Sequence, residues 1–274
     1  MTVMLQITAN GLRFAVRDEG TGPAVLLLHG FPDSAALWRY QVEPLVAAGF
    51  RVVAPDLRGF GASDKPAELA AYRFPTLAED VVGILDALAI TEVQVVGHDF
   101  GAALGWQLAM TRPDRVRRLA ALSVGHPGAF AQVNLEQFQM SWYMFLIQQP
   151  NAEDWFSRDD WLRFRTWLAD APDLDRYLTE LSRPGRLTAG LAWYRANKIA
   201  PGRGPREYGP IHQPVLGIWG VRDHTLGEPQ MTGSAAFVDG SWRYERVTNA
   251  GHWLPLDQPE VITRLLLDFL VRAS

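Results

Sequence analysis

The chain has 274 residues, of which 48% are hydrophobic and 20% are charged, so it is long enough for one large core or for a core with a small second domain. Its net charge of −4, without a basic run, makes nucleic acids and acidic membrane surfaces poor partners. The absence of cysteine excludes disulfides and thiolate metal sites, and no window holds the roughly 18 apolar residues of a membrane span. No basic segment followed by a long apolar stretch opens the chain, so we expect a cytoplasmic protein, either a monomer or a homodimer.

Short apolar runs alternate with stretches of helical spacing along most of the chain. Most of these runs have the length and composition of strands that helices cover on both faces. The predicted strands are residues 4–8, 12–17, 24–28, 51–54, 93–96, 119–123, 215–219 and 242–247. Helices are predicted at 34–48, from Thr76, where Glu79 completes a capping box, and at 259–272. This alternation predicts an α/β fold with a mostly parallel, twisted sheet flanked by helices.

The segment from Gly128 to His212 interrupts this alternation. It is rich in Trp, Phe and Met at helical spacing, and prolines stand before and after it. We interpret it as an all-helical cap, residues 128–212, inserted into a core domain formed by residues 1–127 and 213–274. Such a cap would cover the sheet edge and would also roof an apolar pocket at the strand ends, where α/β folds bind ligands.

The pentapeptide Gly97-His98-Asp99-Phe100-Gly101 directly follows the predicted strand at 93–96. Its spacing is that of a nucleophile elbow, in which glycines on both sides allow a sharp turn between a strand and a helix. The central residue of most such elbows is serine, and here it is aspartate. A carboxylate attacks a saturated carbon that bears a leaving group and becomes an alkyl ester of the protein. The motif therefore predicts Asp99 as the nucleophile.

The loop His29-Gly30-Phe31-Pro32 precedes this elbow, and Asp223 and His252 follow it far downstream. The order nucleophile, acid, histidine is that of the α/β-hydrolases. With these motifs the chain resembles the α/β-hydrolase superfamily almost from end to end. The resemblance implies that His252 takes a proton from the attacking water and that Asp223 orients its imidazole. The strand that ends near Ser123 is the other place for the acid in some relatives, but none follows it here, which favours Asp223.

The same resemblance implies an oxyanion hole and a substrate pocket. The backbone N–H groups of Phe31 and Phe100 are expected to form the oxyanion hole. The residues expected to line the pocket are Phe31, Pro32, Phe100, Trp142 and Trp253.

Two tyrosines of the predicted cap distinguish between possible reactions. Tyr143 stands shortly before Gln148-Gln149-Pro150, and Tyr194 lies within Trp193-Tyr194-Arg195. Both segments, together with the elbow and the His-Gly-Phe-Pro loop, resemble the epoxide hydrolases of this superfamily, although Phe100 stands where tryptophan is usual. An epoxide oxygen leaves as an alkoxide and needs an acid, and a phenol with a pKa of about 10 is in its acid form at pH 7. The resemblance thus implies that Tyr143 and Tyr194 are catalytic and share the epoxide oxygen.

These patterns predict an epoxide hydrolase that converts a small apolar epoxide and water into a vicinal diol, with no metal and no other cofactor. A haloalkane dehalogenase with the same triad is the alternative, but a halide needs N–H donors and the side chains of Phe31 and Phe100 have none. Tryptophans of the cap could supply such donors. A third hypothesis is a protein that binds ligands without turnover, but the intact set of Asp99, Asp223 and His252 disfavours it. The sequence leaves open which epoxide is used and with what regiochemistry and enantiopreference.

Overall fold

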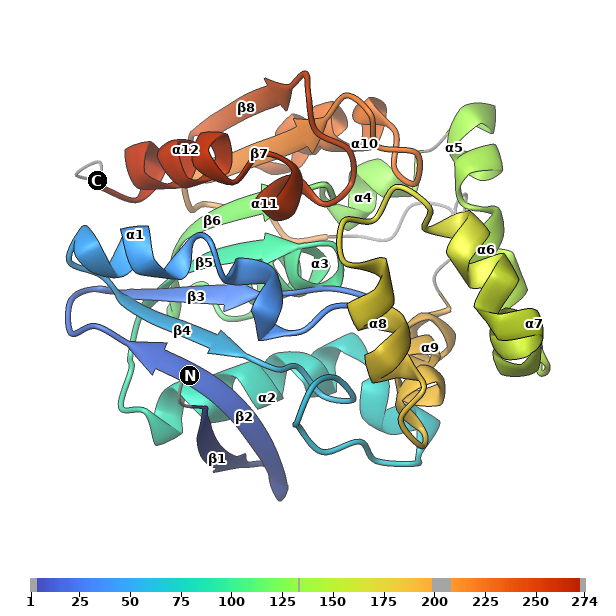
Figure 1. The fold of residues 1–274 in the computed structure, drawn as a ribbon. Coiled ribbons are helices and arrows are strands. Elements are labelled where there is room, and N and C mark those ends of the chain that lie inside the picture. Colours follow the sequence, from blue (N-terminus) through green and yellow to red (C-terminus); the bar gives the residue numbers. More distant parts are fainter. Residues whose placement is uncertain (1–3, 133, 199–207, 272–274) are drawn as a thin grey trace.

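The computed structural model describes residues 4–132, 134–198 and 208–271. Within these residues one sheet of eight strands runs through the molecule in the order β1-β2-β4-β3-β5-β6-β7-β8 (Figure 1). The strands are β1 (Leu5–Ala9), β2 (Leu12–Glu19), β3 (Ala24–Leu28), β4 (Arg51–Pro55), β5 (Val93–His98), β6 (Val116–Leu122), β7 (Val215–Gly220) and β8 (Trp242–Val247). The pairs β1–β2 and β2–β4 are antiparallel and all other neighbours are parallel, which confirms the predicted mostly parallel sheet.

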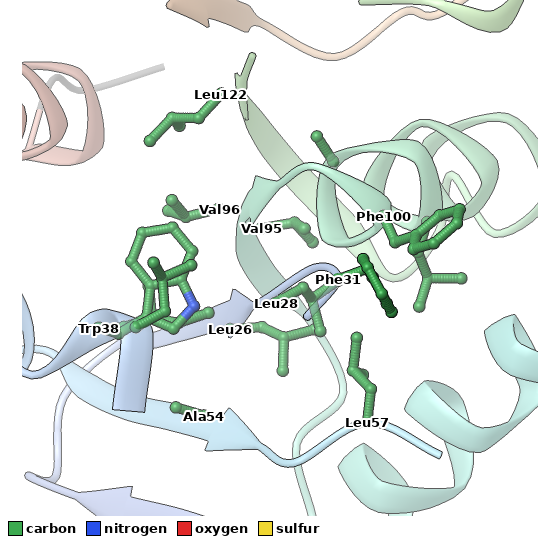
Figure 2. Packing of buried hydrophobic residues seen from close by; sticks show 14 of the residues in the cluster. Leu26, Leu28, Phe31, Trp38, Ala54, Leu57, Val95, Val96, Phe100 and Leu122 are labelled. Atoms are coloured by element: carbon green, nitrogen blue, oxygen red, sulfur yellow. The ribbon is translucent and has the colours of Figure 1, made fainter. Parts of the chain in front are cut away.

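The central strands β3 and β5 are buried along nearly their whole length. Leu26 and Leu28 of β3 pack with Val95 and Val96 of β5 in the apolar core that Figure 2 shows from close by. Continuous apolar runs of this kind form where a parallel strand has helices on both faces, because neither face contacts water. Both strands end at the same edge of the sheet, so the loops that follow them lie side by side.

Helices from the core segments cover the sheet. The longer ones are α2 (Phe74–Ala87), which packs against α3 (Phe100–Thr111), and α12 (Pro259–Val271), which packs against α1 (Val42–Ala47). The remaining short elements are η1 (Ala35–Trp38), η2 (Leu69–Tyr72), α10 (Glu228–Thr232), η3 (Gly233–Phe237) and α11 (Leu254–Asp257).

The chain between β6 and β7 is helical wherever it forms a regular element in the described residues. The helices are α4 (Pro127–Phe130), α5 (Leu135–Met140), α6 (Trp142–Ile147), α7 (Ala152–Trp167, with non-helical backbone at residues 158–161), α8 (Leu174–Leu181) and α9 (Arg186–Asn197). Figure 1 shows α5 to α9 grouped beside the carboxyl ends of the parallel strands. This is the segment in which we expect the cap, and its division from the core at residues 127 and 212 remains a prediction.

Two predicted helices differ from those observed. The helix expected over residues 34–48 is divided into η1 and α1. Helix α2 begins at Phe74 rather than with a cap at Thr76, so the predicted capping box is wrong. The first N–H of the helix, that of Phe74, donates to Oδ1 of Asn197 at 2.9 Å, and Pro75 fits the first turn because its missing N–H needs no partner there. A residue 123 positions away in the chain therefore caps the helix.

Candidate active site

The elbow between β5 and α3 holds Asp99 in a backbone conformation that side chains rarely adopt, with φ of 53° and ψ of −121°. The flanking glycines are required because a side chain at either position would collide with neighbouring backbone atoms. A Cβ on Gly97 would lie 2.3 Å from the carbonyl oxygen of Gly101, and a Cβ on Gly101 would lie 2.0 Å from that of Leu28 in β3. The turn is therefore as tight as the sequence predicts, and it places the Asp99 carboxylate at the carboxyl edge of the sheet.

The loop after β3 supplies a hydrogen bond to this carboxylate. The backbone N–H of Phe31 donates to Oδ1 of Asp99 at 2.8 Å, and a cis peptide bond joins Phe31 to Pro32. Phe31 and Phe100 follow β3 and β5, respectively, and lie near one another in Figure 2. Burial acts to raise the pKa of Asp99, but the positive charge of His252 and the hydrogen bond from the N–H of Phe100 hold that pKa below its usual value. Asp99 is therefore a carboxylate near neutral pH.

His252 lies between two carboxylates. Its Nδ1 is 2.9 Å from Oδ2 of Asp223, and its Nε2 is 3.6 Å from Oδ2 of Asp99. Burial acts to lower the pKa of His252, but the charge and hydrogen bond of Asp223 and the charge of Asp99 raise it to about 10. The resting imidazole is consequently protonated, and its positive charge offsets one of the two negative charges of the buried acids.

The main chain at His252 is also held in place. Its carbonyl oxygen is 2.8 Å from Nε2 of His98 and accepts a hydrogen bond of 2.8 Å from the Ser123 hydroxyl. Burial lowers the pKa of His98 to about 4, so this neighbour stays neutral and donates through Nε2–H to the carbonyl. The ends of β5 and β6 thus fix the loop that carries His252.

Tyr143 of α6 and Tyr194 of α9 meet above Asp99. Both rings are buried, their centroids are 6.1 Å apart, and both residues line the same cavity as Asp99. Neither phenol hydroxyl has a hydrogen-bond partner among the residues that the structure describes. Burial, followed by the charge of Asp99, raises the pKa of each phenol well above 10. Two neutral O–H donors are thus available to a molecule in the cavity.

The cavity has a volume of about 520 Å³, large enough for a small organic molecule. Asp99 is the acidic residue in its wall, and much of the remaining surface is apolar. The apolar part of the wall includes Phe74, Phe100, Ala103, Val124, Pro127, Phe130, Met144 and Leu226. Its polar side chains include Arg73, Gln107, Asn197 and Lys198.

The family model described as alpha/beta hydrolase fold matches residues 23–259. The chain belongs to the α/β-hydrolase superfamily. It is 32% identical to epoxide hydrolase A of Mycobacterium tuberculosis over 96% of each chain, and 32% identical to epoxide hydrolase 3 of Xenopus tropicalis over 97% of this chain and 77% of the frog protein. These relatives place the hydrolase in the epoxide hydrolase family.

Solved structures agree. An epoxide hydrolase from metagenomes of hot environments superimposes over the whole of both chains with a TM-score of 0.89 and 27% identity. The epoxide hydrolase of Bacillus megaterium, solved with an inhibitor, gives a TM-score of 0.87 at 28% identity over 98% of this chain and all of the other. The fold of this hydrolase is therefore that of the family throughout its length.

The predicted pocket needs a correction. Of its five residues only Phe100 is in the wall of the cavity. Trp142 is 42% exposed, its ring packs against Trp155 and Trp167, and it is not in the wall of the cavity. The ring of Phe31 packs among aromatic rings that include Tyr194 and Trp167, so its contribution beside Asp99 is the backbone N–H.

The other two pocket residues also lie elsewhere. Trp253 is buried against His252 and Tyr177, with ring centroids 5.2 and 6.3 Å away. Pro32 borders a separate, much smaller cavity beside Arg176. Both residues support the loops that carry functional groups of this hydrolase, and neither reaches the cavity wall at Asp99.

Sequence reasoning missed two residues beside the triad, Thr225 and Gln137. The Thr225 hydroxyl lies 2.7 Å from Oδ1 of Asp223 and 2.9 Å from Nδ1 of His252. Gln137 of α5 is buried against the same loop. Neither carries a motif, because hydroxyl and amide side chains are common and only their neighbours in space make them notable.

No group of three or more His, Asp or Glu side chains among the described residues of the hydrolase could hold a metal ion. No helix there combines the length and apolar character that crossing a membrane requires.

Proposed function

We propose that this hydrolase converts a small apolar epoxide and water into a vicinal diol through an alkyl ester of Asp99. The observation that carries the proposal is the pair of phenols, Tyr143 and Tyr194, which face the cavity beside the nucleophile without partners among the described residues. Both phenols face the cavity and are in their neutral form, so the pair can donate two hydrogen bonds to a substrate oxygen.

The first half-reaction opens the epoxide ring. Oδ1 of Asp99 is held by the N–H of Phe31, which leaves Oδ2 to attack an epoxide carbon. As the carbon–oxygen bond of the ring breaks, the oxygen accepts a proton from the phenols. The ester that forms has no charge, so His252 loses one of the two carboxylates that raise its pKa and can release its proton. That proton balances the one gained by the opened oxygen and restores the phenol.

The second half-reaction hydrolyses the ester. Neutral His252 takes a proton from water as the water oxygen attacks the carbonyl carbon of the Asp99 ester. The negative charge of the tetrahedral intermediate develops on Oδ1, where the N–H groups of Phe31 and Phe100 stabilise it. Collapse of the intermediate passes the proton from His252 to the diol oxygen and leaves the second proton of the water on Asp99. That proton then moves from Asp99 to His252, which restores the carboxylate and the resting imidazolium. Asp223 holds the imidazole and stabilises its cation throughout.

The cavity wall argues against dehalogenation as the main activity. A departing halide is stabilised by N–H donors, and no tryptophan is among the described residues of the wall. The amides of Gln107 and Asn197 are in the wall, but Asn197 already bonds Phe74 and the carbonyl of Tyr72. Phenols suit an oxygen that must be protonated better than a halide that needs no proton.

Paired assays with styrene oxide and 1-chlorobutane test the proposal. We expect diol from the epoxide and no chloride release above that of Asp99→Ala. Chloride without diol would assign the site to dehalogenation. A single turnover in heavy-oxygen water tests the intermediate, since the label should enter Asp99 while the first diol carries an unlabelled oxygen. Label found directly in the first diol would mean that free water attacks the epoxide.

A further inference from the structure

The loop that follows β7 brings a third side chain to the pair Asp223–His252. Thr225 lies two residues after Asp223, and its Oγ1 is 2.7 Å from Oδ1 of Asp223 and 2.9 Å from Nδ1 of His252. The same nitrogen of His252 is 2.9 Å from Oδ2 of Asp223. The three side chains therefore form a closed triangle of polar contacts on the side of the imidazole that faces away from Asp99.

The hydrogens of this triangle can be assigned by counting. A threonine hydroxyl has one proton, and an ionised carboxylate has none to give. The Thr225 proton therefore goes to Oδ1 of Asp223, and Oγ1 offers a lone pair to Nδ1 of His252. That nitrogen must then carry a proton, which it shares between Oδ2 of Asp223 and Oγ1 of Thr225. The arrangement leaves Nε2, the nitrogen on the side of Asp99, as the one that can gain or lose a proton.

The loop after β7 supplies three hydrogen bonds to Oδ1 of Asp223, the oxygen that does not contact His252. Oδ1 of Asp223 accepts hydrogen bonds from the N–H groups of Thr225 and Leu226, at 2.8 and 3.0 Å, besides the one from the Thr225 hydroxyl. With Oδ1 engaged in this way, Oδ2 is the oxygen left for His252. The loop thus decides which carboxylate oxygen contacts the imidazole and in which direction.

A cap residue fixes the loop in turn. The Nε2 amide of Gln137 in α5 donates to the carbonyl oxygen of Thr225 at 3.0 Å, and its Oε1 accepts from the N–H of Gly227 at 2.8 Å. The same amide nitrogen donates to the hydroxyl of Ser141 at 2.8 Å. Gln137 is almost wholly buried, so it holds the residues on both sides of Leu226 through bonds that water does not replace.

We propose that Thr225 is a positioning residue for the base His252, and that Gln137 anchors the loop carrying it. This inference rests on the proposed function, because it assigns Thr225 to the step in which His252 acts. Ring opening uses Asp99 and the two tyrosines, whereas ester hydrolysis requires a correctly oriented His252 with a free Nε2. Loss of the hydroxyl should therefore slow ester hydrolysis and spare ring opening.

The central comparison is Thr225→Val with Thr225→Ser. Valine keeps the shape and the backbone N–H but has no hydroxyl, and serine restores the hydroxyl. A buried hydrogen bond to a charged group is typically worth about 10- to 100-fold in rate. We expect Thr225→Val to slow ester hydrolysis by about that factor while ring opening changes less than about two-fold, so that the ester accumulates. Thr225→Ser should hydrolyse the ester near the wild-type rate.

Single-turnover rates from quenched samples, read by intact-protein mass spectrometry, separate the two half-reactions. Thr179→Val is the matched control, because that hydroxyl only donates to the carbonyl of Asp175 on an exposed face of α8. Gln137→Leu should also slow ester hydrolysis more than ring opening. Gln149→Leu, whose amide donates to the carbonyl of Phe145, should change neither step. Equal losses in both half-reactions, or unchanged ester hydrolysis in Thr225→Val, would overturn the proposal.

A measurement without turnover keeps the two proposals separate. Oγ1 of Thr225 accepts from Nδ1–H and stabilises the imidazolium more than the neutral ring, so Thr225→Val should lower the pKa of His252 in the resting enzyme. Nitrogen-15 NMR titration of the ring reads this pKa, and Thr225→Ser should restore it. An unchanged His252 pKa in Thr225→Val would contradict the positioning role. Failure of the wild type to form an Asp99 ester would reject the proposed function instead, and the NMR result would still decide on Thr225.

Discussion

Nε2 of His252 lies 3.6 Å from Oδ2 of Asp99, beyond ordinary hydrogen-bond length but well within ion-pair distance. The other oxygen of the same carboxylate accepts the Phe31 N–H at 2.8 Å. The two oxygens of Asp99 therefore have different surroundings, with Oδ1 at the N–H of Phe31 and Oδ2 toward His252. In the proposed mechanism this difference assigns attack to Oδ2 and the later oxyanion to Oδ1.

The roles of Asp99 and His252 predict different behaviour for two variants. His252→Ala should still be alkylated by an epoxide but should not hydrolyse the ester, whereas Asp99→Ala has no nucleophile. Intact-protein mass spectrometry should show His252→Ala heavier by one epoxide and Asp99→Ala unchanged, and peptide mapping should locate the adduct on Asp99. The same response from both variants would show that the roles are misassigned.

Removal of the hydroxyls of Tyr143 and Tyr194 should lower the rate of ring opening and leave the rate of ester hydrolysis nearly unchanged. General-acid assistance contributes about 10²- to 10⁴-fold, so the double variant with Tyr143→Phe and Tyr194→Phe should open epoxides slower by about that factor. Single variants should lose less than half of this effect on a logarithmic scale if one phenol partly replaces the other. The rate of ester hydrolysis, measured in the same single-turnover experiment, serves as the control. A folded double variant that opens epoxides near the wild-type rate would mean that the phenols only pack.

The raised pKa of His252 predicts a pH dependence of stability. Its folded pKa of about 10 lies above the ordinary value of 6.5, so the contribution to stability is fully present below about pH 6.5 and is lost as the pH rises through about 10. Asp99→Ala removes one of the charges that raise this pKa, so both the NMR titration of His252 and the loss of stability should move to lower pH. His126, whose pKa is near 4 because of burial, provides an internal control. No movement of the His252 titration in Asp99→Ala would mean that the two groups are not coupled.

A buried ion pair predicts a large loss of stability away from the active site. Arg58 donates from Nε and Nη2 to the two oxygens of Asp80, at 2.7 and 2.6 Å, and both side chains are nearly inaccessible. Arg58→Leu leaves a buried carboxylate without its cation, which typically costs about 3–5 kcal/mol of unfolding free energy. Arg165→Leu, which breaks the exposed pair with Asp175, should cost less than about 1 kcal/mol. Urea unfolding measures both, and similar small losses would show that Asp80 adapts without its partner.

Local patterns were sufficient for much of this molecule. The strands at 24–28 and 242–247 have the predicted bounds, because a short apolar or alternating run bounded by turn residues specifies a strand without reference to distant residues. The elbow glycines were predictable for a similar reason. The steric demand of a sharp strand-to-helix turn acts within five residues, and Gly97 and Gly101 meet it as expected.

Contacts between distant segments determine the features that the sequence did not predict, which are a helix start, side-chain positions and the pKa of His252. Asn197 caps the start of α2, and Trp142 packs against Trp155 of α7. The residues next to Thr76 and Trp142 in the sequence do not predict either contact. Gln137 bonds the loop after β7 because α5 packs on that loop, and Thr225 contacts His252 because the loops after β7 and β8 lie together. The pKa of His252 likewise depends on two acids from other parts of the chain. Periodicity determines which elements form, but the direction of a side chain and the charges around it arise only when those elements pack together.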